Sequence, residues 1–192
     1  ADKVNILWLG DSLCDFDRSF NAVDKLSFWL NKYNPGKFHI ENRAVRGDHI
    51  LRVEERMLGR KCFAPAAYDN LWNKPYDFIV IQLGNNDCAA TTNNRFASPV
   101  VATEKVVPAY ERLLKLIRKH SSAKLIVTSA TYPDVPLMTR NGERALGKYF
   151  FARFGMEQFV VPFNTAVKEF AAKNGAEFVD LHTPMKEGYA GE

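Results

Sequence analysis

The stretch that decides the fold is Val4–Leu9 (VNILWL), followed directly by Gly10-Asp11-Ser12-Leu13. A short, mostly apolar run that stops at a glycine predicts a strand buried on both faces. Similar runs recur at residues 38–44, 77–83, 124–130 and 176–181, and helical patterns at 20–33, 49–58, 104–120 and 161–174 separate them. This alternation predicts an α/β fold with three layers, in which helices cover both faces of a five-stranded parallel sheet.

The composition bounds the class of protein. The 192 residues suit one domain, and 46% hydrophobic with 25% charged residues is the ordinary globular range. The net charge of +4 is small, and both signs are interspersed, as in Arg52-Val53-Glu54-Glu55-Arg56. We therefore expect these charges to form the solvated face of helix 49–58, and we expect no nucleic-acid partner. No apolar run approaches the roughly 18 residues of a membrane span.

Cysteines and histidines give no sign of a metal or cofactor site. The three cysteines, Cys14, Cys62 and Cys88, form no C-x-x-C motif, and the four histidines lack metal-ligand spacing. Cys14 and Cys88 each follow a polar strand-end residue by two positions, so they either form a disulfide or are two buried thiols. The first residues, Ala-Asp-Lys, match what a cleaved signal peptide leaves, which favours a secreted or periplasmic protein over a cytoplasmic one. Nothing in the sequence indicates an oligomeric state.

Polar residues follow the first three predicted strands. Ser12 follows the first, Gly47 the second and Asn86 the third, within Gly84-Asn85-Asn86-Asp87. The carboxyl ends of parallel strands meet at one edge of a sheet, where ligands bind. The backbone N–H groups of Ser12 and Gly47 and the side-chain amide of Asn86 would there surround an oxygen that becomes negative, as in an oxyanion hole.

These three segments resemble the first three conserved blocks of the SGNH (GDSL) hydrolases, in order and separation. The resemblance implies a flavodoxin-like fold and a serine esterase or lipase that needs no metal. It also implies that Ser12 is the nucleophile and that Ser12, Gly47 and Asn86 form the oxyanion hole. Asp11 and Asp87 would brace the turns.

The general base of that family, in an Asp-x-x-His loop after the last strand, has no match here. The nearest spacing is Asp180-Leu181-His182. Either His182, held by Asp180, is a variant base, or His182 lies in a surface turn and the catalytic loop and last helix lie beyond Glu192. The sequence favours the second reading, so the general base is unassigned within residues 1–192.

The sequence therefore predicts an esterase for small, acetyl-type esters, with a carbohydrate or aryl group as the alcohol. The aromatic insert at residues 131–159 could bind that group, or its segment 149–159 could be a helix with its rings in the core. The alternative function is a catalytically silent module on the same fold that binds acylated sugars or anions. A flavodoxin-like phosphate or flavin protein is disfavoured, because the first strand–helix turn lacks a phosphate-cradling loop.

Overall fold

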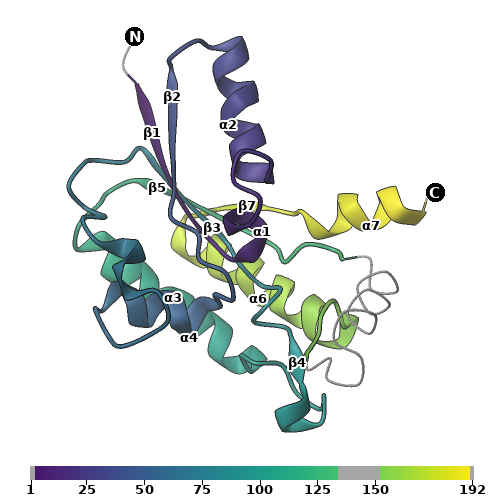
Figure 1. Cartoon of the computed structure of the whole chain (residues 1–192). Helices are drawn as coiled ribbons and strands as arrows, with labels where there is room; N and C mark the ends of the chain where they lie inside the picture. Colours follow the sequence, from purple (N-terminus) through teal and green to yellow (C-terminus); the bar gives the residue numbers. More distant parts are fainter. Residues whose placement is uncertain (1–2, 134–151, 191–192) are drawn as a thin grey trace.

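A five-stranded parallel sheet forms the centre of the molecule. The structure is a computed structural model that describes residues 3–133 and 152–190 (Figure 1). Its strands are β1 (Val4–Gly10), β2 (Phe38–Asn42), β3 (Phe78–Gln82), β5 (Lys124–Thr128) and β7 (Glu177–Val179). Their order, β2-β1-β3-β5-β7, with every pair parallel, is the flavodoxin-like order. The predicted sheet is confirmed.

Helices lie on both faces of this sheet (Figure 1). The main core lies under α3 (Ile50–Met57), α4 (Thr103–Arg118) and α6 (Glu157–Asn174). The predicted helix 104–120 corresponds to α4, and the apolar residues that α4 repeats at helical spacing are buried or partly buried in that core. On the opposite face, α1 (Ser12–Asp15) and α2 (Ala22–Tyr33) pack beside β1 and β2 around a small cluster that includes Cys14 and Val23. The three-layer architecture is confirmed.

Several short elements were not predicted. The predicted helix 20–33 is preceded by a separate short helix, α1, and α6 begins at Glu157 rather than at residue 161. Strands β4 (Ala90–Thr91) and β6 (Ala152–Arg153) form an antiparallel pair, and 3-10 turns occur at Pro65–Tyr68 and Thr92–Asn94. Elements of two to four residues are too short to show a periodicity. Of the aromatic insert, residues 134–151 lie outside the described residues.

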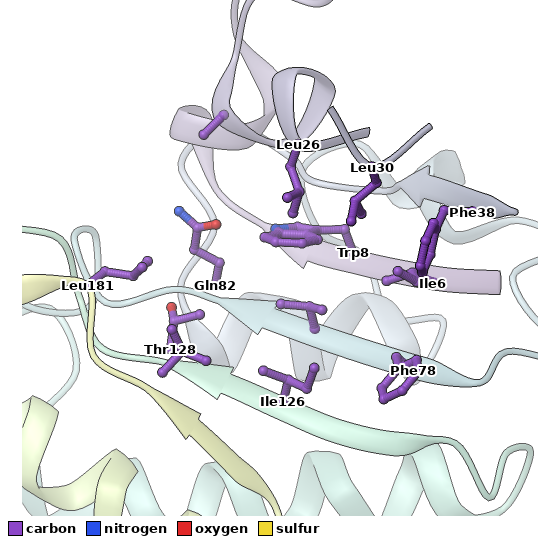
Figure 2. Close-up of a pocket in the computed structure, with 13 residues that line it drawn as sticks. Ile6, Trp8, Leu26, Leu30, Phe38, Phe78, Gln82, Ile126, Thr128 and Leu181 are labelled. Carbon is purple, nitrogen blue, oxygen red and sulfur yellow. The ribbon is translucent and has the colours of Figure 1, made fainter. Parts of the chain in front are cut away.

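The face of the sheet on which α1 and α2 pack also has an open apolar trough (Figure 2). Its volume is about 560 Å³, and side chains of β1, β3 and β5, including Trp8 and Ile126, form its floor. Leu26 and Leu30 of α2 form one wall. Helix α7 (His182–Ala190) follows β7 but extends away from the sheet, and residues 183–189 are exposed. In the described part of the chain, α1 and α2 are thus the helices on this face, and α7 does not line the trough.

Within residues 3–133 and 152–190, no helix combines the length and the apolar character that are needed to cross a bilayer.

Candidate active site

The strand register places three strand ends side by side. Gly10, the last residue of β1, pairs with Gln82, the last residue of β3, and Trp8 pairs with Asn42 at the end of β2. The loops that follow these strands carry Ser12, Gly47 and Asn86. All three loops therefore start at the same edge of the sheet.

The first loop turns sharply from β1 into α1. A side chain at Gly10 would bring its Cβ within 2.9 Å of the Cys14 sulfur and 3.3 Å of the Gln82 carbonyl, so the turn requires glycine. Asp11 is buried and caps α1, because its Oδ1 accepts a hydrogen bond of 3.0 Å from the Leu13 N–H. Ser12, the first residue of α1, is half-buried. Within the described residues, neither its hydroxyl nor its backbone N–H makes a hydrogen bond.

The second loop is held against the first. The Val45 N–H donates to the Gly10 carbonyl at 3.0 Å, and the Arg46 N–H donates to the Asp15 carboxylate at 2.9 Å. Gly47 has a φ of +75°, which favours glycine, and its carbonyl accepts from the Arg52 guanidinium at 2.9 Å. Its own N–H has no acceptor in the part of the chain that the structure describes.

The third loop is held against the second. Asp87 is fully buried, and its carboxylate accepts from the Gly84 N–H at 3.0 Å and the Ile50 N–H at 2.9 Å. One amide hydrogen of Asn86 is donated to the Asp48 carbonyl at 2.9 Å. The Asn86 nitrogen carries a second N–H, and that one has no acceptor among the described residues. Hydrogen bonds thus join all three loops into one unit.

Buried carboxyl groups lie beneath this unit. Burial raises the pKa of Asp11 to about 6 and that of Asp87 to about 7. The negative charge of Asp48 also raises the pKa of Asp11, and that of Asp11 also raises the pKa of Asp87. Among residues 3–133 and 152–190, no group of three or more His, Cys, Asp or Glu side chains is arranged to hold a metal ion. The carboxyls of Asp11 and Asp87 instead bond to backbone N–H groups of the loops.

The raised pKa of Asp87 predicts a pH-dependent stability. Its pKa moves from an ordinary value of 3.8 to about 7, so the folded protein keeps a proton that the unfolded chain releases. The contribution of this group to stability therefore falls as pH rises from about 4 through about 7. Asp87→Asn removes this titration. We expect the free energy of unfolding of the variant minus that of the original chain to increase by about 2–3 kcal/mol when the pH is raised from 5 to 8.

Urea denaturation of both proteins at the two pH values measures this change. Asparagine cannot accept both backbone N–H groups, so the variant is less stable throughout, and only the change with pH reports the titration. A difference that is equal at pH 5 and pH 8 would show that Asp87 titrates at its ordinary pKa.

His182 does not lie in a surface turn as predicted. It is buried, begins α7, and packs its ring against Tyr132 with centroids 5.3 Å apart. Asp180 accepts from the N–H groups of His182 and Thr183 at 2.9 and 3.1 Å, so its carboxylate caps the first turn of α7. Asp180 therefore lies two residues before His182 as the cap of α7, and not as a hydrogen-bond partner of the His182 imidazole.

The contacts of His182 also argue against it as the base. Its ring packs against Tyr132, and no hydrogen bond joins it to Ser12 among the described residues. We therefore expect His182→Ala to keep more than a tenth of the esterase turnover of the original chain. Steady-state assays with p-nitrophenyl acetate measure this, and a loss of more than about 1,000-fold in a folded variant would restore His182 as the base.

His49 is the histidine nearest in sequence to Gly47. It precedes α3. Burial is the main cause that lowers its pKa to about 4, and the positive charge of Arg52 is the second. The ring is therefore neutral at neutral pH. Its Nδ1 is buried without a hydrogen-bond partner among the described residues. No histidine of the described part is hydrogen-bonded to Ser12, and the general base stays unassigned.

The cysteines are free thiols. Cys14 packs against Val23 and Ala44, whereas Cys88 is buried in the main core and donates to the Phe159 carbonyl at 3.5 Å. The Cys14–Cys88 disulfide, one of the two alternatives, is therefore not formed, and two buried small side chains are what the structure contains.

Arg56 was predicted to lie on a solvated face, which is wrong. Only 3% of it is exposed, and it forms a buried ion pair with Asp48. A signal for this was present in the sequence, because Ile50, Val53 and Arg56 are spaced by three and all face the core. An arginine on an apolar stripe predicts a buried partner of opposite charge.

Comparisons with known proteins bear on the family and the fold of the chain. The model of the GDSL-like Lipase/Acylhydrolase family matches residues 8–191, and no curated protein matches the sequence. Among solved structures, the acetyl xylan esterase Axe2 from Geobacillus stearothermophilus is 17% identical, with 99% of this chain and 82% of that chain covered and a TM-score of 0.68.

Two further solved structures are similar to this chain. The acetyl xylan esterase AlAXEase is 14% identical, with 95% and 79% covered and a TM-score of 0.67. The SGNH-hydrolase family esterase AlinE4 is 16% identical, with 93% and 76% covered and a TM-score of 0.60. At these identities the likeness shows a shared fold, whereas the family model covers nearly the whole sequence. The chain belongs to the GDSL-like lipase/acylhydrolase family.

Proposed function

We propose that this carboxylic-ester hydrolase uses Ser12 as its nucleophile on small, acetyl-type esters. The observation that carries the proposal is a set of unused donors on three connected loops. The N–H groups of Ser12 and Gly47 and one N–H of Asn86 have no acceptor within the described residues. All three residues are half-buried, so their donors can reach a ligand, and three unused donors suit an oxygen that becomes negative during a reaction.

The chemistry follows from these groups. The Ser12 oxygen attacks the ester carbonyl, and its proton passes to a general base. The carbonyl oxygen takes up negative charge and is stabilised by Ser12, Gly47 and Asn86. The intermediate collapses with loss of the alcohol, which takes the proton from the base, and water then releases the acid from Ser12 by the same steps.

The surroundings of Ser12 support an apolar or sugar-like alcohol. A pocket of about 660 Å³ beside Ser12 is lined by Leu13, Phe16 and Phe20, which are exposed. Aromatic side chains of this kind stack on sugar and aryl rings. Two of the similar structures are named as acetyl xylan esterases, which supports acetyl esters on a carbohydrate as the substrate.

A binding module is the second candidate function, and one observation favours it. The Ser12 hydroxyl has no hydrogen-bond partner in residues 3–133 and 152–190, and a serine without a base is a weak nucleophile. Incubation with p-nitrophenyl acetate and with a fluorophosphonate probe separates the two functions. Turnover and labelling at Ser12 support the esterase, whereas a folded protein with neither would be a binding module.

A further inference from the structure

The Arg56 side chain makes a dense set of contacts below the second loop. Its Nη1 and Nη2 bond to the two carboxylate oxygens of Asp48, the latter at 2.9 Å, and both side chains are fully buried. Nη2 also donates to the Phe63 carbonyl at 2.7 Å, and Nε donates to the Ala64 carbonyl at 3.0 Å. The planar guanidinium is thus fixed in one orientation, as a fork that engages four acceptors.

Asp48 connects this ion pair to the candidate oxyanion donors. Its backbone carbonyl accepts the side-chain amide of Asn86 at 2.9 Å, and its N–H donates to the Val45 carbonyl at 3.1 Å. Asp48 directly follows Gly47, which has a φ of +75°. Glycine has no Cβ that limits its backbone angles. The backbone around Gly47 and Asp48 therefore depends on outside contacts for its orientation.

The bond to Asp48 determines where Asn86 points. A carboxamide nitrogen carries two N–H groups in one plane. When the Asp48 carbonyl takes the first N–H, it fixes the direction of the second, which has no acceptor in the described part of the chain. A shift of the Asp48 backbone would turn this second N–H away, and a displacement of about 1 Å can lower a rate by about 100-fold.

We propose that Arg56 is a positioning residue, which, through its bidentate pair with Asp48, holds the Asp48 carbonyl and so aims the Asn86 amide at the oxyanion. This inference rests on the proposed function. A buried ion pair is weak evidence for stability alone, since apolar residues often replace such pairs without loss. The fixed geometry of the pair, next to a flexible glycine, is what the positioning role uses.

Arg56→Lys tests the inference, because lysine keeps the charge but not the planar fork. We expect kcat for p-nitrophenyl acetate to fall by about 10- to 100-fold, with KM within about threefold of the original value. The inhibition constant of phenylboronic acid should rise by the same factor as kcat/KM falls. Its boron accepts the Ser12 oxygen and forms a tetrahedral anion that resembles the transition state.

Arg112→Lys is the matched control. Arg112 also makes a bidentate pair with a residue of α3, Glu54, but on the exposed surface. It should leave kcat and boronate inhibition unchanged. All assays are run well below the unfolding temperature of each variant. If Arg56→Lys does not fold, Asp48→Asn is the test, with the same expected split between kcat and KM.

Two results would overturn the positioning role. One is a folded variant with kcat within threefold of the original, and the other is a loss of activity that leaves boronate inhibition unchanged. Ser12→Ala is assayed in parallel. If turnover does not depend on Ser12, the proposed function is wrong and this inference falls with it. Ser12-dependent turnover that Arg56→Lys retains overturns this inference alone.

Discussion

Ser12→Ala is expected to lower the turnover of p-nitrophenyl acetate by at least about 10,000-fold and to abolish labelling by a fluorophosphonate. The substitution removes the oxygen that forms the acyl-enzyme and leaves the three candidate donors in place. Since Ser12 is half-buried and its hydroxyl has no hydrogen bond in the described structure, the change should leave the unfolding temperature nearly unchanged. Steady-state kinetics and thermal unfolding of both proteins measure these effects.

Ser27→Ala serves as the control for this experiment. Ser27 lies in α2, and its backbone carbonyl, rather than its hydroxyl, accepts a hydrogen bond from the Asn31 side chain. Its replacement should keep full turnover. If Ser12→Ala retained more than a tenth of the activity, Ser12 would not be the nucleophile, whatever the family of the chain.

Asn86→Ala should lower kcat by about 100- to 1,000-fold, the usual cost of losing one donor to an oxyanion. The donor acts on charge that develops only in the transition state, so KM should change little. Substrate saturation curves for the two proteins measure both constants.

The neighbouring Asn85 provides a matched comparison. Its amide is bonded to the Thr131 hydroxyl at 2.9 Å, and it is not among the candidate donors. Asn85→Ala should therefore lose less than about tenfold in kcat. Equal losses in the two variants, or a rise in KM that accounts for the loss in Asn86→Ala, would indicate that Asn86 supports the loop rather than the oxyanion.

The sheet and its long helices could be predicted because their signals are local. β3 is a continuous apolar run that is buried on both faces, and α4 repeats its apolar residues at helical spacing. The strand order then follows from few choices, and it brings the ends of β1, β2 and β3 together. The sequence alone thus predicts that the three polar segments at the strand ends lie at one edge of the sheet.

The parts that could not be predicted depend on contacts between distant residues. Asp180 binds the first turn of α7 and the Ser129 hydroxyl, and sequence spacing alone does not distinguish a helix cap from a partner of His182. The burial of Arg56 depends on carbonyls of the loop that contains Phe63 and Ala64. The bond from Asn86 to the Asp48 carbonyl joins residues that are 38 positions apart, and no local pattern specifies it.

A crystal structure of the chain after reaction with a fluorophosphonate would test the central claim most directly. We expect phosphorus bonded to the Ser12 oxygen. The phosphonyl oxygen should lie about 2.7–3.1 Å from the Ser12 nitrogen, the Gly47 nitrogen and the Asn86 amide nitrogen. A phosphonyl oxygen that lies near none or only one of these nitrogens, or an adduct on another residue, would contradict the account.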